Sequence, residues 1–507
     1  MKKALRGIVI AVILVAMIAT MTACNHYKWD AVGTTEYSSQ EAVNNGSLYV
    51  QQGKYVYFVN GSYENSSLTK DDNEWGSVSV KGSIMKASVN DDGSLKVLGV
   101  VVPKLFLSSY SGAGIYVYGD WIYYVSRSLK TDNKGSLISA VEFMRTKTDG
   151  TKTQSIALVE DISSTFVYTS KGLIYTYDSD IYFKGYNADK VNKDADKIVD
   201  DYSAVVASNT DQCIFYTKAS SNSLVSANSL GVVTKDGSKK VIISEKAYSS
   251  SEEYYTDLDN LFTITVVSYD AKSDTLVYTK KCANSAAKTG TYTYHFSGSF
   301  DFDKTKEVKF ANSALSSVYV LSDATTSNTL GLVDTSSSTV KVYYPIAEGA
   351  LDNTSREVTF NAQITILYTT NEYVYFGMGS LLYRVNLFNV DATVVSKPYT
   401  DKISEAKYST PYGNPTNIGN NIYFISSDDS SYLYMVNVAE FAKNEENGAI
   451  TYANGYIVSG YKAYTYGDDD DFVINKDKGE KLENMVPKYM TSDDLKTYIS
   501  NHKTDNE

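Results

Sequence analysis

Histidine, cysteine and proline are scarce in this chain of 507 residues, which contains three, three and six of them respectively. Two of the histidines, His26 and His502, lie far from the central part of the sequence, where His295 stands alone. A three-histidine metal site is therefore excluded. The chain also lacks a glycine-rich phosphate loop and a redox Cys-x-x-Cys pair, so no cofactor-binding residue is predicted.

The few cysteines exclude a disulfide scaffold. Besides Cys24 there are only Cys213 and Cys282. Aligning residues 213–220 with 275–282 places these two cysteines seven positions apart on equivalent strands, an axial offset of ~23 Å. A disulfide requires Cα atoms within about 7 Å of each other. We therefore expect both thiols to be unpaired.

No catalytic constellation is evident. A Ser-His-Asp triad would have to use His295, which no nucleophile-elbow motif accompanies, so a structural histidine is favoured. Alternation along its strand places His295 on the opposite face from Tyr294 and Phe296. We predict no catalytic residue and no metal ligand from these patterns.

Carboxylates are plentiful but grouped along the sequence, whereas a hydrolase needs two of them about 5 to 9 Å apart across a cleft. Asp257-Leu258-Asp259-Asn260 is similar to the start of a calcium loop but lacks the glycine and the terminal glutamate of that motif. Solvated loop carboxylates are the favoured interpretation; bound calcium and a paired-acid glycosidase are the alternatives. The close groups are Asp178/Asp180, Asp257/Asp259, Asp301/Asp303 and Asp468–Asp471.

Positive charge is outweighed by negative charge, with 47 Lys and Arg residues against 59 Asp and Glu. Three basic residues precede an unbroken apolar run over residues 8–18, as in an export signal that ends at residue 23. Removing residues 1–23 takes away three positive charges and no negative ones, so the net charge falls from −12 to −15. A surface this acidic repels nucleic acid, which we exclude as a partner.

Residues 21–24, Met-Thr-Ala-Cys, resemble the lipobox of bacterial lipoproteins, with methionine in place of the usual leucine. The resemblance implies cleavage before Cys24 and attachment of a diacylglycerol-type lipid to its sulfur. Two acyl chains suffice for stable membrane anchoring. An uncleaved membrane anchor is the alternative. Both interpretations place the body of the protein outside the cytoplasmic membrane, held at its outer face.

Short Tyr/Val/Ile runs dominate the rest of the chain, separated by polar turn residues, and helical periodicity is nearly absent. Residues 121–159 show the unit most clearly: three strand-like runs over 121–125, 141–145 and 154–159, with Asp149-Gly150 predicting a hairpin turn with positive φ at both positions. Similar runs recur around eight apolar anchors: Val56, Ile122, Ile174, Ile214, Leu276, Val318, Val374 and Ile422.

The order of an aromatic-rich strand, a polar loop, Leu-Tyr-Arg and Asp-Gly-Thr resembles bacterial propeller repeats of unassigned function. Those repeats are similar to the propellers of low-density-lipoprotein-receptor-related proteins, although the Tyr-Trp-Thr-Asp tetrapeptide is missing here. We predict an all-β fold, a single β-propeller of seven or eight four-stranded blades. Sheets that are apolar on both faces favour this closed arrangement. A string of β-sandwiches is the alternative fold.

The expected organisation is a signal peptide over residues 1–23, a polar tether over 24–45, the propeller over 46–466 and an acidic tail over 467–507. Within the tail, the capping pattern of Thr491 and Asp494 predicts a short helix near 491–502.

Tyrosines recur two residues apart, which places each pair on one face of a sheet. Packing between blades, with hydroxyls that reach neighbouring carbonyls, is the favoured interpretation; an aromatic platform for sugars or peptides is the alternative. The pairs are Tyr55/Tyr57, Tyr116/Tyr118, Tyr175/Tyr177, Tyr292/Tyr294 and Tyr373/Tyr375.

These features favour a lipid-anchored binding or scaffold module at a bacterial cell surface, with a protein, peptide or glycan as ligand. A carbohydrate-active hydrolase or lyase that uses loop carboxylates over the propeller channel is the alternative. A purely structural component of the cell envelope is a third interpretation.

Replacing Cys24 by Ala tests the anchor, because the substitution removes the only sulfur to which the lipid is expected to be attached. The variant should appear in the culture medium, as measured by immunoblotting of medium and membrane fractions. Retention in the membrane fraction would instead indicate an uncleaved anchor.

Overall fold

A computed structural model describes most of the repeated region. The described residues are 35–60, 83–89, 95–102, 114–127, 133–134, 140–160, 165–186, 195–218, 229–244, 257–322 and, beyond these, Pro415 and the strands between 329 and 490 whose bounds follow. Regular structure in them is β, apart from three single 3₁₀ turns: η1 (Leu258–Asn260), η2 (Ala286–Lys288) and η3 (Lys304–Lys306). The prediction of an all-β chain is confirmed.

The first four sheets each contain four consecutive antiparallel strands. They are formed by β1 (Tyr49–Gln52), β2 (Tyr55–Asn60), β3 (Ser83–Val89) and β4 (Leu95–Val102); by β5 (Tyr116–Tyr118), β6 (Trp121–Arg127), β7 (Ala140–Lys147) and β8 (Thr153–Glu160); by β9 (Phe166–Tyr168), β10 (Gly172–Tyr177), β11 (Asp180–Gly185) and β12 (Asp196–Val199); and by β13 (Tyr202–Ser208), β14 (Cys213–Lys218), β15 (Ser229–Val233) and β16 (Lys239–Ser244).

The fifth, sixth and seventh sheets repeat this plan, and the eighth sheet has a fifth strand. They are formed by β17 (Phe262–Asp270), β18 (Thr275–Cys282), β19 (Gly290–His295) and β20 (Val308–Ala311); by β21 (Val318–Ser322), β22 (Thr329–Asp334), β23 (Thr339–Tyr343) and β24 (Thr354–Thr359); by β25 (Ile364–Thr369), β26 (Tyr373–Met378), β27 (Leu381–Asn386) and β28 (Thr400–Lys402); and by β29 (Thr416–Ile418), β30 (Asn421–Ile425), β31 (Leu433–Asn437), β32 (Gly455–Ile457) and β35 (Lys488–Met490).

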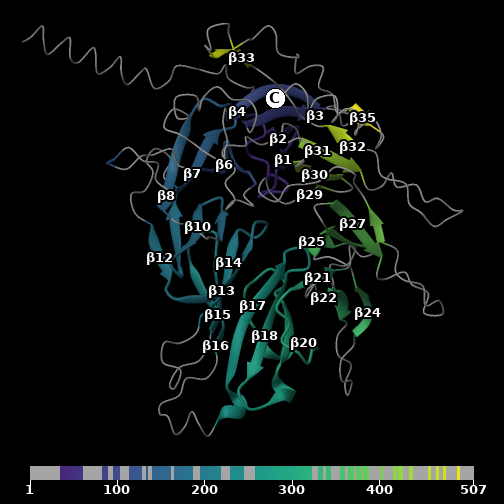
Figure 1. Cartoon of the computed structure of the whole chain (residues 1–507). Coiled ribbons are helices and arrows are strands. Elements are labelled where there is room, and N and C mark those ends of the chain that lie inside the picture. Colours follow the sequence, from purple (N-terminus) through teal and green to yellow (C-terminus); the bar gives the residue numbers. More distant parts are fainter. Residues whose placement is uncertain are drawn as a thin grey trace, which may run out of the picture.

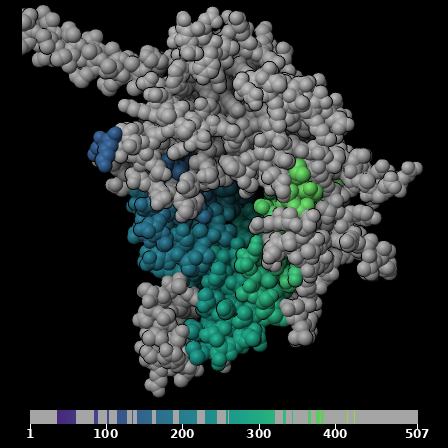
Figure 2. All heavy atoms as spheres, viewed as in Figure 1, coloured from purple at the N-terminus to yellow at the C-terminus, as the bar shows by residue number. Residues whose placement is uncertain are grey.

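These eight sheets follow one another around a propeller ring (Figure 1). First strands of successive sheets lie against one another, as β9 does with β13, β13 with β17 and β17 with β21. In a space-filling view the described atoms of the third to sixth sheets form one continuous body (Figure 2). The arrangement fits the seven or eight blades expected, and a string of separate β-sandwiches is excluded.

Alternate residues of one strand serve two different interfaces. In β10, Leu173 and Tyr175 pack toward the second sheet, whereas Ile174 between them packs toward the fourth. In β18, Tyr278 packs toward the fourth sheet and its neighbour Val277 toward the sixth. Because side chains of a strand alternate between faces, a strand that is apolar at every position must be covered on both sides. The ring provides that cover.

All eight sequence anchors are buried, each with 2% exposure or less. Seven of them lie in the second strand of their sheets, so the repeat alignment is correct there. Val318 is the exception, because it begins β21, the first strand of the sixth sheet. The predicted equivalence is wrong at this position, where a first strand carries the same apolar pattern as a second strand.

The predicted hairpin between β7 and β8 is present, but its turn differs from the prediction. Only Gly150 has a positive φ, of 78°, and its N–H donates to the carbonyl of Lys147 over 2.8 Å. Asp149 is not in the left-handed region; its Oδ1 accepts the N–H of Thr151 over 2.9 Å. The loop is a tight turn followed by one left-handed glycine, which requires positive φ at a single residue.

The Leu-Tyr-Arg motif places a cation directly opposite a tyrosine of the second strand. The same register recurs in three sheets, where the pairs are Tyr57 with Lys86, Tyr123 with Arg145 and Tyr375 with Arg384. All three cations are buried. The repeat therefore places a cation at the same buried position in each of these three sheets.

Two of these cations, Lys86 and Arg145, also bridge neighbouring sheets. Lys86 Nζ lies 4.2 Å from the ring centroid of Tyr55 and donates to the carbonyl of Thr148, in the next sheet, over 3.2 Å. Burial lowers the pKa of Lys86 to about 8. The guanidinium of Arg145 lies 5.4 Å from the ring of Tyr186, which follows the third strand of the next sheet. Each cation thus contacts aromatic faces and the following blade together.

Two short strands fall within residues 467–507, where an acidic tail was expected. β34 (Phe472–Ile474) pairs with β33 (Tyr464–Tyr466) across the aspartate run, and β35 joins the last sheet. The helix predicted near 491–502, the signal peptide over 1–23 and most of the tether over 24–45 lie outside the described residues. Among the residues that are described, no helix is both long and apolar enough to span a bilayer.

Replacing Ile174 by Ala tests the two-sided packing, because the side chain is fully buried between the third and fourth sheets. Its loss should lower the free energy of unfolding by about 2 to 5 kcal/mol. Val241→Ala, at a side chain that is 52% exposed, is the matched control and should change it by less than about 1 kcal/mol. Urea unfolding followed by tyrosine fluorescence measures both; equal effects would contradict the two-sided burial.

Candidate functional site

Two hairpin turns from neighbouring sheets bring three carboxylates together. Asp211 lies in the turn between β13 and β14, and Asp270 and Asp274 flank the turn between β17 and β18. The Tyr269 hydroxyl donates to Asp274 Oδ1 over 2.8 Å, and the charges of Asp270 and Asp274 are close enough to act on Asp211. We call these four residues the acidic turn cluster.

Backbone and hydroxyl donors hold each carboxylate in place. The Ser208 hydroxyl donates to Asp211 Oδ2 over 3.2 Å, and Asp270 Oδ2 accepts both the N–H and the hydroxyl of Ser273, at 3.0 and 2.5 Å. The N–H of Gly298 donates to Asp274 Oδ2 over 2.5 Å. Side chains that accept such bonds have little freedom, so the cluster is a fixed arrangement.

Burial and like charge act together on Asp211. Its pKa is raised above the ordinary range, first because the carboxyl is partly removed from water and then because Asp274 and Asp270 are close. The pKa of the Tyr269 hydroxyl is also raised, again mainly by burial and then by its bond to Asp274. Tyr269 is therefore a proton donor, in its neutral form, at any ordinary pH.

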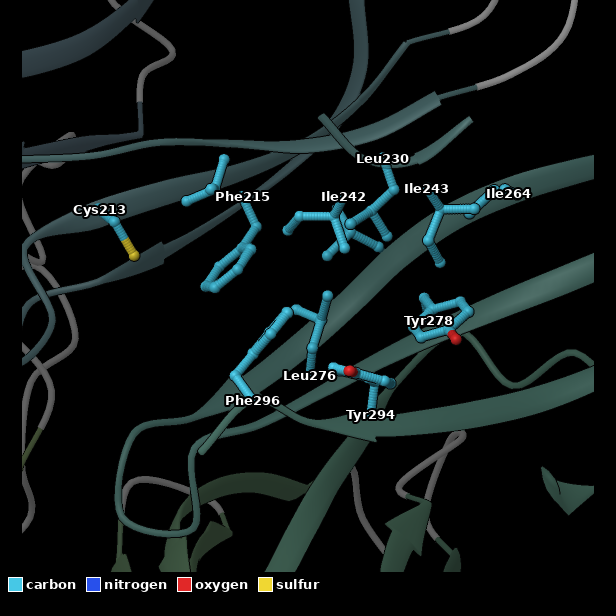
Figure 3. Close-up of a cluster of buried hydrophobic side chains, with 12 residues drawn as sticks. Cys213, Phe215, Leu230, Ile242, Ile243, Ile264, Leu276, Tyr278, Tyr294 and Phe296 are labelled. Atoms are coloured by element: carbon cyan, nitrogen blue, oxygen red, sulfur yellow. The ribbon is translucent and has the colours of Figure 1, made fainter. Parts of the chain in front are cut away.

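An aromatic core supports the cluster from below. The ring of Tyr269 lies 4.6 Å from that of Phe215 in a tilted arrangement, and Phe215 in turn lies 6.0 Å from Phe296. Figure 3 shows Cys213 next to Phe215, at the end of this core away from Tyr278. Burial raises the pKa of the Cys213 thiol, and the nearby charges of the acidic turn cluster raise it further. Cys213 is thus an inert core residue.

The left-handed backbone conformation recurs around this cluster. Gln212, Asp274 and Ser297 have φ values of 55°, 47° and 57°. Non-glycine residues rarely adopt this region, and aspartate tolerates it better than most. At Asp274 it aims the carboxylate back toward Tyr269 and across the turn to Gly298.

His295 lies beside the cluster but has no catalytic geometry. Its Nδ1 is 2.7 Å from the carbonyl oxygen of Ser273, so this nitrogen carries a proton and donates. The Ser273 hydroxyl donates to Asp270 instead of to the imidazole. The ring therefore ties β19 to the preceding turn, as the structural interpretation of His295 expects.

The other aspartate groups are dispersed, and several of their carboxylates have a local partner. Asp180 binds Lys197 at 2.7 Å and accepts the N–H of Asp201. Asp301 binds Lys240 at 2.5 Å, and Asp303 begins η3 by accepting from Thr305. The aspartates at 468–471 lie outside the described residues.

The calcium-like segment forms η1. Asp257 Oδ1 accepts from the Asn260 side chain over 2.6 Å, and the Asn260 Oδ1 atom accepts from Lys288 over 2.9 Å. A lysine thus lies where a calcium loop would require the cation. Within the described residues, no three His, Cys, Asp or Glu side chains are arranged to hold a metal ion.

The tyrosine pairs fill the ring and bind its backbone. Tyr118 donates its hydroxyl to the carbonyl of Tyr168 in the next sheet over 2.8 Å. Tyr292 and Tyr294 donate to the carbonyls of Lys288 and Asp301, each over 2.9 Å. The packing interpretation of these pairs is confirmed where the contacts are described. Tyr177 is accessible, at 40% exposure.

A second titratable group lies inside the fifth sheet. Lys280 Nζ and Glu307 Oε1 are 2.5 Å apart with both side chains almost buried, and Tyr278 donates its hydroxyl to the same carboxylate. The lysine also lies 5.0 Å from the ring of Tyr292. A buried, fully paired group of this kind fixes a sheet interface more readily than it performs chemistry.

Sequence reasoning missed the acidic turn cluster because Asp211 lies 58 or more positions before the other three members, in a different repeat. A signal was available: Asp211 and Asp274 both precede the second strand of their sheets, so a correct repeat alignment places them at corresponding turns. Cys24, the predicted lipid attachment site, lies outside the described residues.

No protein-family model matches the sequence, and a search of curated proteins finds no match. Similar solved structures include one from a study of two prolyl endopeptidases (11% identity, TM-score 0.35, covering 79% of this chain and 55% of that one), AztD from Citrobacter koseri (12%, 0.35, 75% and 96%) and TolB from Acinetobacter baumannii (12%, 0.26, 75% and 77%). The alignment thus spans just over half of the prolyl endopeptidase chain. Similarity at this level carries no argument about function.

Thiol labelling tests the core beneath the cluster. Cys213 and Cys282 are both buried and unpaired. A maleimide should therefore label neither rapidly in the folded mature protein and both in the denatured, unreduced protein, as counted by intact-mass spectrometry. Two unreactive thiols in the denatured protein would show a disulfide and contradict the alignment of β14 with β18.

Proposed function

We propose that this protein is a lipid-anchored β-propeller that acts outside the cytoplasmic membrane as a binding or scaffold module at a bacterial cell surface. The sequence around Cys24 supports the anchor and the compartment. A diacylglycerol-type lipid would hold the chain at the outer face of the membrane, and residues up to the first strand would form the tether.

The observation that carries this proposal is the two-sided burial of the sheets. Apolar side chains fill the described interfaces, as Ile174 does between the third and fourth sheets and Val277 does between the fifth and sixth, so the sheet faces are occupied by the ring itself. What remains for a partner is the set of turns between strands. Turns held by a rigid scaffold are a common place for binding residues.

Among the described turns, those of the acidic turn cluster are the best candidates for contact. They combine three carboxylates with a half-buried tyrosine on two adjacent blades, and hydrogen bonds hold their orientation. The net charge of −15 after removal of the signal segment adds a long-range attraction for cationic groups. A protein, peptide or glycan with a basic group would fit this chemistry.

A carbohydrate-active enzyme is the second candidate. Asp211, whose pKa is raised, lies near two further carboxylates, and glycosidases use one protonated and one ionised carboxyl. Against this role, Asp270 and Asp274 are held by hydrogen bonds from Tyr269, Ser273 and Gly298, which occupy their carboxylate oxygens. The binding role is therefore favoured.

Crosslinking and pull-down from intact cells distinguish the two candidates. The wild-type protein should capture a specific partner, and Asp211→Asn/Asp270→Asn should lose most of it, whereas Asp236→Asn, in an exposed turn of the fourth sheet, should retain it. Equal capture by all three proteins would exclude the acidic turn cluster as the contact. Cleavage of cell-surface glycans that disappears with Asp211→Asn would favour the enzyme.

A further inference from the structure

The segment before the first strand joins sheets that their own strands do not join. The N–H and carbonyl of Val43 bond to the carbonyl and N–H of Gln51, in β1, over 2.8 and 3.3 Å. The chain then turns, and the carbonyl of Ser47 accepts the N–H of Ile115, just before β5, over 2.8 Å. We call residues 43–47 the N-terminal strap. It is hydrogen-bonded to both the first and the second sheet.

The strap occupies the free edge of β5, which pairs with β6 along its other edge. The N–H of Ile115 bonds to Ser47 as described, and its carbonyl accepts the N–H of Gly46 over 2.8 Å. The side chain of Asn45 serves Val117 in the same way, accepting its N–H over 2.7 Å and donating to its carbonyl over 3.3 Å. These four backbone groups thus have partners in the strap, as a neighbouring strand would supply them.

Two glycines allow this close approach. A Cβ on Gly114 would lie 2.3 Å from the carbonyl carbon and oxygen of Gly46 in the strap. A Cβ on Gly46 would lie 2.2 Å from Nδ2 of Asn209, which belongs to the turn between β13 and β14 in the fourth sheet. Gly46 also has a φ of 90°, which favours glycine. The strap therefore packs against the fourth sheet, with no room for a side chain at this point.

The contact at Asn209 acts on the turn that carries Asp211. The Tyr116 hydroxyl, from the second sheet, donates to Asn209 Oδ1 over 3.0 Å. In the same turn, Gln212 accepts the N–H of Ser170, from the third sheet, over 2.7 Å. We propose that the N-terminal strap is a positioning element, which fastens the first, second and fourth sheets together and fixes the turn that presents Asp211.

Further contacts seat the chain before the strap on the first sheet. The carbonyl of Gln40 accepts Nε2 of Gln52 over 3.0 Å, and the ring of Tyr37 lies 5.4 Å from that of Tyr55. A Cβ on Gly53, in the turn between β1 and β2, would lie 2.4 Å from the Tyr37 ring. The strap thus enters the ring from a fixed path. Its contacts with three sheets do not rest on the proposed function; only their effect on a bound partner does.

A double-mutant cycle in the mature protein tests the contact between strap and turn. Gly46→Ala should raise the unfolding equilibrium constant by about tenfold or more, because its methyl group overlaps Asn209. Asn209→Ala removes the overlapping amide, so in that background the added effect of Gly46→Ala should fall to that of Gly298→Ala. Gly298 has a similar φ, of 85°, with open space around its Cβ, and is the matched control for backbone strain. Additive effects in urea unfolding would overturn the contact.

Hydrogen exchange followed by mass spectrometry covers irreversible unfolding and reports on the edge of β5 directly. Asn45→Ala removes both bonds to Val117, so a peptide spanning residues 114–119 should exchange about fivefold faster than in wild type. A peptide spanning residues 172–177, in the third sheet, should exchange at the wild-type rate. Unchanged exchange over 114–119 would contradict the role of the strap at this edge.

The orientation of the turn has its own readout. In Gly46→Ala the displacement of Asn209 should loosen the turn, so a peptide spanning residues 208–213 should exchange about fivefold faster than in wild type. An unchanged rate there would overturn the positioning of this turn. If that rate rises while partner capture from intact cells stays the same, the strap stands and the binding role proposed for the turn fails.

Discussion

The ring depends on one constraint: each sheet is apolar on both faces and must be covered twice. A strand such as β10 meets this by sending Ile174 toward one neighbouring sheet and Tyr175 toward the other. Removing cover from one face would expose a row of large apolar side chains, so no blade is stable without its neighbours. The closed arrangement thus follows from the sequence pattern, and the turns are what the fold leaves free.

Tyrosine suits this constraint because it is apolar along the ring and polar at the tip. Tyr118 and Tyr168 fill space between the second and third sheets while their hydroxyls bind carbonyls across the interface. Buried donors must find acceptors, and sheet edges supply them. The 45 tyrosines are thus consistent with a packing role that phenylalanine would fill without the bonds between blades. Lys86 and Arg145 add a cationic version of the same bridge.

Features set by local alternation and turn residues were predictable; those set by contacts between repeats were not. Seven of the eight anchors identified second strands, because burial on both faces leaves a continuous apolar run. The assignment of Val318 to a second strand was wrong, because this first strand carries the same continuous apolar run. The cluster around Asp211 and Asp274 could not be predicted before adjacent blades were aligned, because a sequence pattern does not give the distance between two turns. The left-handed backbone at Asp274 is likewise set by its bonds to Tyr269 and Gly298.

Every sheet described here is made of strands that come from one stretch of the chain, so none combines a strand from the start with strands from the end. Many rings are locked by such a shared blade; none of the sheets described here is of that kind. Duplication or deletion of one whole unit would leave the hydrogen bonding of every other sheet intact. The number of blades can therefore change during evolution without altering the strand pairing of the remaining sheets.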